Sequence, residues 1–307
     1  MVMNTGAFSE ELWPGIEAHF GDAYENWETG WNKIVTIHQS DKAFEKFQGI
    51  TNYGLASLKA QGGSVQYADK FEGFPKEIIN YTYALGSMIT YEMMRYEQYD
   101  RMKSIPQQLA ESVRKTEETV VFNLLNNGFS TASSPTLTAD GKSLFNSAHL
   151  LVAANNVTQK NTPSTAADLS QSALETAYID ISNFVDDQNL PIMARPVKII
   201  VPTASQLLVR KILETEYEVD SGNNTINPVA TTRANAPLEI VVSPYLTDTD
   251  GWFLKTNVDD GLVFTDVDPV ALDRDNEFDT KNLKFSAMRL FGVGAVNYLG
   301  MYGSPGA

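Results

Sequence analysis

The feature of this sequence that most constrains its fold is a long helix predicted for residues 104–127 by the spacing of its apolar residues. Ser104 and Gln107 match a capping box at its start, and Gly128 supplies a left-handed stop at its end. At 1.5 Å per residue the helix would be about 35 Å long, roughly twice the average. Its apolar or small residues recur every three or four positions, on one face: Ile105, Leu109, Val113, Thr116, Val120 and Leu124.

The opposite face of this helix is charged, so we expect it to meet solvent or a polar neighbour. Its residues are Glu111, Arg114, Lys115, Glu117 and Glu118. We therefore predict that Val113 and Val120 pack against another part of the protein, whereas Arg114 and Glu118 do not. An aspartate at Val113 should be poorly tolerated, and Glu118→Gln should be neutral.

The composition indicates a soluble globular protein made inside the cell, since 20% of its 307 residues are charged and 43% are hydrophobic. There is no run of eighteen apolar residues, and the first twelve residues lack the regions of a signal peptide. The chain has no cysteine and only three scattered histidines, so we expect no metal site and no cofactor. The net charge of −15 argues against a nucleic-acid groove.

Residues 1–52 are rich in aromatic side chains and poor in periodic structure. Glycine and proline interrupt them repeatedly, so the segment cannot build a core of its own. Two interpretations are open. The segment is either an N-terminal arm that lies on another surface, of this chain or of a neighbour, or an irregular N-terminal subdomain.

Residues 53–90 show alternating apolar side chains on either side of a glycine pair at 62–63, and again at 79–85. A period of two around glycine and a polar middle predicts a long two-stranded excursion. Because a lone two-stranded ribbon is barely stable in water, it must rest on another surface.

Strands and helices alternate between residues 166 and 280, which predicts a compact α/β unit. Residues 281–307 are strand-like with regular glycines, and they could return to the long helix. The predicted elements of the α/β unit are helices at about 169–185 and 203–214 and strands at 197–201, 238–242, 252–255 and 262–264.

Several short motifs could carry chemistry, and none of them is complete. Residues 141–143 (Gly-Lys-Ser) match the end of a phosphate-binding loop, but Thr136 stands where that loop needs a glycine. Residues 292–294 (Gly-Val-Gly) begin a dinucleotide fingerprint, but Asn297 replaces its third glycine.

The candidates for acid–base and nucleophilic chemistry are equally weak. Residues 220–222 (Asp-Ser-Gly) lack the second aspartate that an aspartic protease needs, and Ser147 and His149 lack a supporting turn motif. The acidic pairs have no calcium-loop spacing and are read as solvated turns; they are Asp186 with Asp187, Asp259 with Asp260, and Asp273 with Asp275. We therefore expect no catalytic, cofactor-binding or metal-binding residue and no enzymatic activity.

The order of these elements, together with particular short words, resembles the major capsid proteins of tailed bacteriophages, most closely the Mu-type major head subunit. The resemblance covers nearly the whole chain, and its strength lies in the order of the words. They are YALGSMIT at 83–90, DGKSLFNSAH at 140–149, LPI at 190–192, VP at 201–202, NP at 227–228, VSPYLTD at 242–248 and WFL at 252–254.

This resemblance implies an α+β fold with an N-terminal arm, an extended β-loop, a peripheral domain built on a long spine helix, and an axial α/β domain. The arm and the loop would reach to neighbouring subunits. The implied boundaries are 1–52 for the arm, 53–90 for the extended loop, 91–165 for the peripheral domain with its spine helix at 104–127, 166–280 for the axial domain, and 281–307 for the strand that returns to the peripheral domain.

The resemblance also implies partners and a location. Copies of this chain would form hexamers and pentamers of an icosahedral shell in the virion, after synthesis in the cytoplasm of a host bacterium. The shell would enclose double-stranded DNA without sequence-specific binding and without contact to a membrane. Because the arm begins near residue 1, we expect any scaffold to be a separate protein, alongside a portal and possibly decoration proteins.

Two other interpretations remain open. An encapsulating compartment with the same fold would share these sequence features, and only genes for portal and terminase would separate the two. An α/β hydrolytic enzyme that uses residues 166–280 with serine or carboxylate chemistry is the other alternative.

Overall fold

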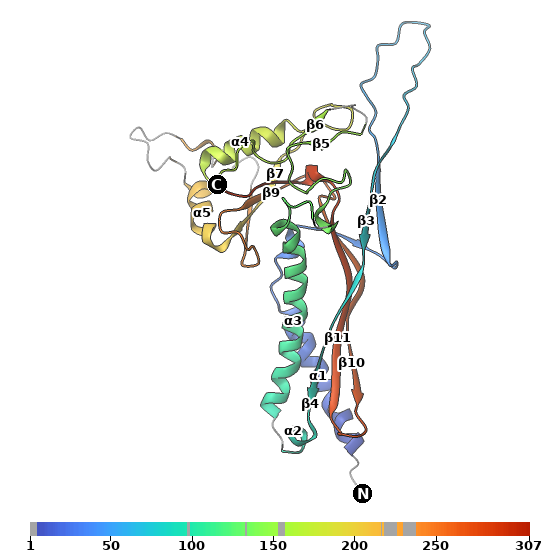
Figure 1. Cartoon of the computed structure of the whole chain (residues 1–307), viewed down its shortest axis with the longest axis vertical. Helices are drawn as coiled ribbons and strands as arrows, with labels where there is room; N and C mark the ends of the chain where they lie inside the picture. The colour runs from blue at the N-terminus through green and yellow to red at the C-terminus, as the bar shows by residue number, and fades with distance from the viewer. Residues whose placement is uncertain are drawn as a thin grey trace.

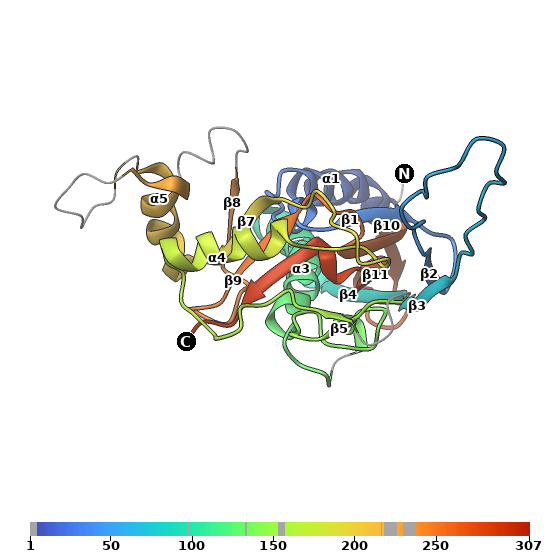
Figure 2. The same ribbon diagram turned by 90° about the horizontal axis from the view of Figure 1, so that it is seen from above.

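The computed structural model shows an elongated molecule in which a long helix runs beside a long sheet, with a second sheet at one end (Figure 1). Seen from above, the second sheet and its helices extend to one side and an extended loop to the other (Figure 2). None of the helices described is long and apolar enough to cross a membrane. The described residues are 5–96, 99–132, 134–152, 157–215, 217, 226–229 and 238–307.

The long helix, α3 (Tyr99–Asn126), begins before the predicted capping box, after a short helix α2 (Tyr91–Arg95). Ser104 is therefore inside the helix and is not its N-cap, and the prediction of a capping box was wrong. A serine can cap a helix, but it is also tolerated inside one where the backbone upstream is already helical. The predicted position of the helix end is confirmed, because α3 ends at Asn126 and the N–H of Gly128 donates to the carbonyl of Leu125. The predicted left-handed stop was wrong, because Gly128 does not have a positive φ.

The packing of α3 agrees with the prediction on the apolar face and contradicts it on the charged face. Val113 is buried and Val120 is half-buried against the core. Glu118, which was expected to be exposed, is only 3% exposed, and the N–H of Gly30 donates to its Oε1 at 2.6 Å. Burial raises the pKa of Glu118, although hydrogen bonds from the backbone N–H groups of Gly30 and Trp31 oppose the rise.

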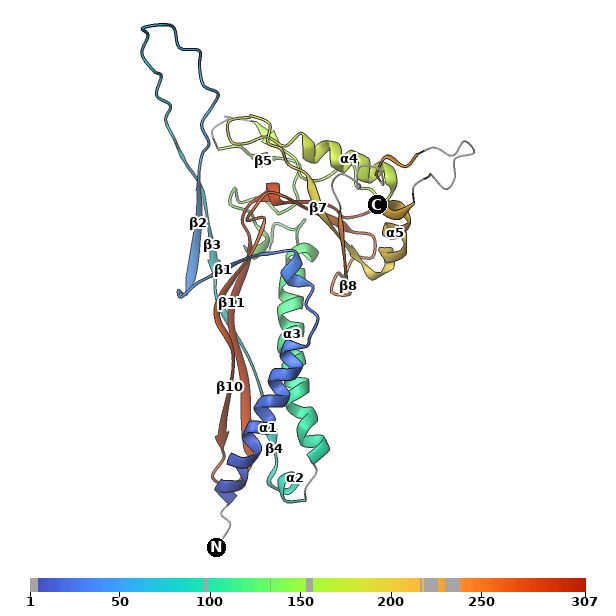
Figure 3. The same ribbon diagram turned by 180° about the vertical axis from the view of Figure 1, so that it is seen from behind.

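Arg114, also expected to be unpacked, is only 16% exposed, because α1 (Thr5–Glu25) and the segment after it lie along this part of α3 (Figure 3). The side chains of Glu111 and Lys115 remain 41% and 51% exposed, as predicted.

The long sheet has four strands, and α1 and α3 cover one of its faces (Figure 3). Its first strand is parallel to its neighbour, and the other pairs are antiparallel. Alternate residues of the central strand face the helices and are buried, notably Leu283, Phe285 and Ala287. The strands are, in spatial order, β1 (Thr36–Gln39), β10 (Leu262–Asn276), β11 (Leu283–Ala295) and β4 (Tyr81–Ile89).

The second sheet also has four strands, and it contains the strands predicted near residues 197, 238 and 252. Its strands are, in spatial order, β12 (Met301–Ser304), β9 (Trp252–Thr256), β7 (Pro196–Pro202) and β8 (Glu239–Ser243). The helices beside it are α4 (Gln171–Ser182) and α5 (Gln206–Glu214), with a short 3-10 turn η3 (Thr203–Ser205) before α5. The strand predicted at 262–264 is much longer than expected, because β10 continues along the long sheet.

The extended loop is a hairpin whose paired strands are β2 (Phe44–Ile50) and β3 (Glu72–Ile79). Residues 51–71 form its tip without strands, contrary to the prediction of strands on either side of the glycine pair. The strand predicted near residues 79–85 exists as β4, but it pairs with β11 in the long sheet instead of within the hairpin. The prediction assigned these patterns to one ribbon because alternation identifies a strand but not its partner.

The core consists of three clusters spread along the molecule. One lies between α1, the first half of α3 and the far end of the long sheet, one lies where α3 meets both sheets, and one lies between the second sheet and its two helices. The remaining short elements are η1 (Trp31–Lys33), η2 (Ser134–Thr136), β5 (His149–Leu150), β6 (Thr158–Gln159) and η4 (Tyr298–Gly300).

Candidate functional site

The structure gives the motifs examined for chemistry other roles. Residues 141–143 belong to a turn in which Gly141 has a positive φ of 74°, with neither a strand before it nor a helix after it. Ser147 is exposed, whereas His149 is fully buried. Nδ1 of His149 lies 2.8 Å from Asp140 Oδ2, and its Nε2 lies 3.2 Å from Asn161 Oδ1. Both ring nitrogens are therefore occupied, and His149 is not placed to activate Ser147.

This histidine belongs to a buried polar cluster that holds the segment after α3 in place. The side-chain amide of Asn161 donates to the carbonyls of Leu144, Tyr298 and Met301. The ring of His149 stacks on Tyr298 with centroids 4.0 Å apart. Burial alone would raise the pKa of Asp140, but hydrogen bonds from His149 and Thr138 outweigh burial and lower that pKa to about 2. The cluster is structural.

The acidic pairs are separate from one another. Asp260 bonds His38 at 2.8 Å, and Asp186 accepts the N–H groups of Gln188 and Leu190 in a turn. The motif at 220–222 lies outside the described residues. Within the described ranges no group of three or more His, Cys, Asp or Glu side chains is arranged to hold a metal ion.

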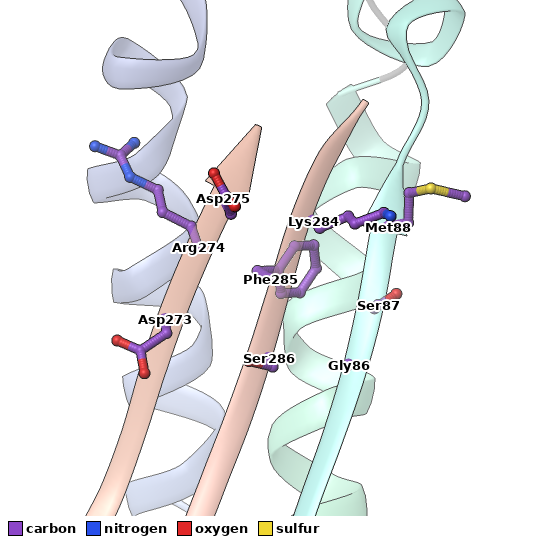
Figure 4. Close-up of a pocket in the computed structure, with 9 residues that line it drawn as sticks. All are labelled: Gly86, Ser87, Met88, Asp273, Arg274, Asp275, Lys284, Phe285 and Ser286. Carbon is purple, nitrogen blue, oxygen red and sulfur yellow. The ribbon is translucent and has the colours of Figure 1, made fainter. Parts of the chain in front are cut away.

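Asp273 and Asp275 border an open pocket of about 600 Å³ on the long sheet (Figure 4). Two of the charged side chains around it contact groups outside the pocket. Lys284 pairs with Glu277 at 2.9 Å, and Arg274 lies over the Trp13 ring at 4.8 Å. The pocket is a shallow depression, and its polar groups do not converge on a point as they do in a ligand site.

Among the described residues, exposed large apolar side chains gather at the tip of the extended loop. Leu58 is fully exposed, and Tyr67 is 95% exposed. More than half of the surface of each of several other large apolar side chains is also exposed, at Ile50, Tyr53, Leu55, Val65 and Phe71. A group of exposed apolar side chains on one loop is typical of a site of contact with another molecule.

The root of the same loop is firmly attached to the rest of the subunit. Ile78 is buried, and it packs directly over Gly294 of β11, where a Cβ atom would lie 2.9 Å from Ile78 Cγ1. Lys76 is also buried, and its ammonium group donates to the carbonyl of Ser134 at 2.8 Å. Burial lowers the pKa of Lys76. The loop therefore combines a fixed root with an uncovered tip.

A buried ionic network attaches the N-terminal helix to α3 and to the long sheet. Glu117 is completely buried, and it pairs with Arg114 at 3.0 Å and with Arg289 of β11 at 3.1 Å. Tyr24 of α1 donates its hydroxyl to Glu117 at 2.8 Å. Arg289 also pairs with Asp266 of β10 at 2.8 Å. One carboxylate thus links α1, α3 and the sheet.

Sequence reasoning missed the residues that fix the loop root and the residues of this network. Gly292 and Gly294 had been weighed as part of a nucleotide motif, whereas they lie inside strand β11. Two glycines two residues apart lie on the same face of a strand and indicate that another part of the chain approaches that face closely. That would have been the better interpretation. No comparable local signal marks Lys76 or Glu117.

Comparisons with known proteins agree with the shape of the subunit. A sequence-family model described as "Phage capsid protein" matches residues 77–304. No curated protein matches the sequence. Among solved structures, the chain is similar to the virus-like particle from Pyrococcus furiosus, with 14% identity, a TM-score of 0.56, and coverage of 96% of this chain and 99% of that one.

Two further structures show the same likeness. Mycobacterium phage Che8 gives a TM-score of 0.53 at 12% identity, covering 91% of this chain and 92% of the other. The capsid of a native GTA particle gives a TM-score of 0.57 at 10% identity, covering 89% of this chain and 88% of the other. At these identities the likeness concerns the fold, which is that of phage capsid subunits.

Proposed function

The chain belongs to the phage capsid protein family, and from this premise we propose that it is the major capsid protein of a tailed phage, closest to the Mu-type head subunit. Many copies assemble into hexamers and pentamers and then into the icosahedral shell that encloses the double-stranded DNA of the phage. The single observation that carries this proposal is the extended loop, with its attached root and uncovered apolar tip.

The physical argument concerns the free energy of burying that tip. Fully burying one large apolar side chain contributes about 1.5–3 kcal/mol, so covering three of them on each copy supplies roughly 5 kcal/mol or more per contact. A monomer gains nothing from leaving them in water. In a shell, each loop lies on a neighbouring copy, and the contact is repeated around every capsomer.

The parts of the subunit correspond to different domains of a capsid protein. The expected boundaries were 1–52 for the arm, 91–165 with 281–307 for the peripheral domain and 166–280 for the axial domain. Following the strand pairing, we propose 1–43 for the arm, 80–165 with 262–307 for the peripheral domain, and 166–261 for the axial domain. The extended loop is taken as residues 44–79 in place of 53–90, because β2 and β3 pair with each other. The expected axial range of 166–280 includes β10, but β10 pairs with β1 and β11 in the long sheet, so we take the axial domain to end before Leu262.

Other properties follow from this role. The protein is a structural component without enzymatic activity, made in the host cytoplasm and located in the virion capsid. A net charge of −15 suits a container that does not grip the DNA it holds. A portal, with or without decoration proteins, would complete the capsid as further chains.

The experiment that tests the role of the loop is removal of its tip. Thr51 and Phe71 are already adjacent, since the N–H of Thr51 donates to the carbonyl of Phe71 at 2.9 Å. Residues 52–70 can therefore be replaced by a two-glycine linker with little entropic cost. The shortened subunit should be soluble with an unchanged circular dichroism spectrum, and electron microscopy should show no closed shells.

A matched substitution separates the tip from exposed apolar residues in general. Leu58→Ser, in the tip, should reduce the yield of shells, whereas Leu207→Ser, at a similarly exposed position on α5, should reduce it much less. If the shortened protein still forms stable shells, the loop is not the assembly contact. If it fails to fold, the tip belongs to the subunit core.

An encapsulating compartment is the second candidate, and the likeness to the virus-like particle from Pyrococcus furiosus favours keeping it. Nuclease-treated particles purified from infected or expressing cells distinguish the two. Protected double-stranded DNA of uniform length supports a phage head, and protected protein cargo supports a compartment.

A further inference from the structure

The extended loop and the long sheet share one continuous stretch of extended chain. β3 pairs with β2 through Ile79, and β4 pairs with β11 from Tyr81 onward. Asn80 is the single residue between the two strands. The chain therefore changes its strand partner at this residue, and the direction of the loop relative to the sheet is set there.

Asn80 is hydrogen-bonded to two other segments of the subunit, the turn before β2 and the strand β10. Its backbone N–H donates to the carbonyl of Ala43, and its side-chain amide donates to the carbonyl of Lys42 at 2.7 Å. Its Oδ1 accepts the hydroxyl hydrogen of Thr265, on β10, at 2.5 Å. These bonds fix the turn that leads into β2 and the long sheet at the same time, so both strands of the hairpin are held at their base.

The neighbouring strand is shaped to admit this side chain. A Cβ atom at Gly292 of β11 would overlap Asn80 Oδ1 and would lie 2.6 Å from Thr265 Oγ1 and 2.8 Å from the carbonyl oxygen of Ile79. Thr265 itself is fully buried. A glycine at this position is therefore required for Asn80 to reach β10 across the surface of β11.

We infer that Asn80 is a positioning residue that fixes the angle at which the extended loop leaves the long sheet, so that the loop works in assembly as a rigid lever. This inference rests on the proposed function of the chain as a shell subunit. A loop at a fixed angle reaches its neighbour at one place, and that place determines how strongly successive subunits curve. Loosening the root should therefore alter the size and closure of the shell more than the folding of the subunit.

The angle can be measured directly because the chain contains no cysteine. Cysteines introduced at Gln48 on β2 and Thr119 on α3, both exposed, carry spin labels across the root. Labelled protein is diluted with unlabelled protein, so that electron–electron double resonance reports only distances within one subunit. Thermal unfolding of the same preparations reports the stability of the subunit, and electron microscopy reports the fraction of closed shells.

The variants test the bonds of Asn80 separately from general stability. Asn80→Ala removes the side-chain bonds, Thr265→Val removes one donor at nearly constant volume, and Thr265→Ser keeps that donor. Asn32→Ala, at an exposed asparagine away from the root, is the matched control. We expect the distance distribution to widen and the fraction of closed, uniform shells to fall for Asn80→Ala and, less, for Thr265→Val, with Thr265→Ser and Asn32→Ala like wild type.

Each other outcome contradicts a definite statement. An unchanged distance distribution in Thr265→Val and Asn80→Ala shows that Asn80 does not set the angle. A wider distribution with normal shells shows that the angle does not matter for assembly. If Asn80→Ala does not fold, Thr265→Val carries the test. Failure of the wild-type protein to form shells overturns the proposed function, while the distance measurement still decides whether Asn80 positions the loop.

Discussion

Removing the carboxylate of Glu117 should destabilise the subunit more than any other single change to a charged residue of α3. The side chain is completely buried and holds two arginines, and it also accepts the hydroxyl hydrogen of Tyr24. The side chains of Arg114 and Arg289 are only 16% and 8% exposed, and Glu117→Ala removes this partner from both of them.

The expected loss of stability depends on which polar partners each arginine keeps in the variant. Breaking a buried ion pair by removing one partner costs about 3–5 kcal/mol, mostly because the other charge stays buried without compensation. Arg289 keeps Asp266 at 2.8 Å, and Arg114 keeps the carbonyl of Tyr24 at 3.0 Å. The expected loss is therefore near the lower end, about 3 kcal/mol of the free energy of unfolding.

The assay is urea-induced unfolding of subunits kept unassembled, with Glu111→Ala as the control. Glu111 pairs with Lys115 one turn away on the same helix, but the two side chains are 41% and 51% exposed. Such a pair contributes about 0.3–0.5 kcal/mol. Equal unfolding midpoints for the two variants would refute the reasoning, because they would mean that burial of the Glu117 network adds nothing.

Two further predictions concern packing and pH. Val113→Asp places a charge in the cluster between α1, α3 and the sheet, so it should lower the free energy of unfolding by several kcal/mol and give insoluble protein. Thr119→Asp, on the exposed side of α3, should remain soluble. Equal solubility of the two variants would show that the apolar stripe was misassigned. The folded-state pKa of Asp140 is lowered from 3.8 to about 2, so its contribution is present above pH 3.8 and is lost as the pH falls toward 2. Wild type should lose about 2 kcal/mol of stability in that window relative to Asp140→Asn, as measured by urea unfolding, and parallel pH profiles would contradict this assignment.

The sequence was most informative where a pattern repeats locally. The apolar stripe of α3 and the buried strands β7 and β9 were predicted because periodicity and composition record which faces are buried. The positions of Glu117 and Glu118 could not be predicted in the same way. A glutamate on a helix reads as exposed unless its partner is known, and their partners lie at Arg289 and Gly30, far away in the sequence.

The extended loop shows a different limit. The alternation near residues 58–67 predicted paired strands, but no strand forms there, and the apolar side chains are exposed. The role of the loop root could not be predicted because its key residue interrupts the strand pattern. Asn80 lies between two strand patterns and reads as a break in one of them, although its side chain determines how the two strands are joined. The sequence locates the loop and does not reveal what orients it.

The late position of β11 and β12 in the chain has a consequence for biosynthesis. Each of the three core clusters contains residues from this stretch: Phe285 in the first, Phe291 in the second and Tyr302 in the third. The central strand of the long sheet is also absent until residue 283 onward has been made. A ribosome that has translated the loop and α3 therefore carries a chain with an apolar tip but without a completed core. Folding is therefore completed only after the last strands emerge, and until then the apolar side chains of the core are exposed together with those of the tip.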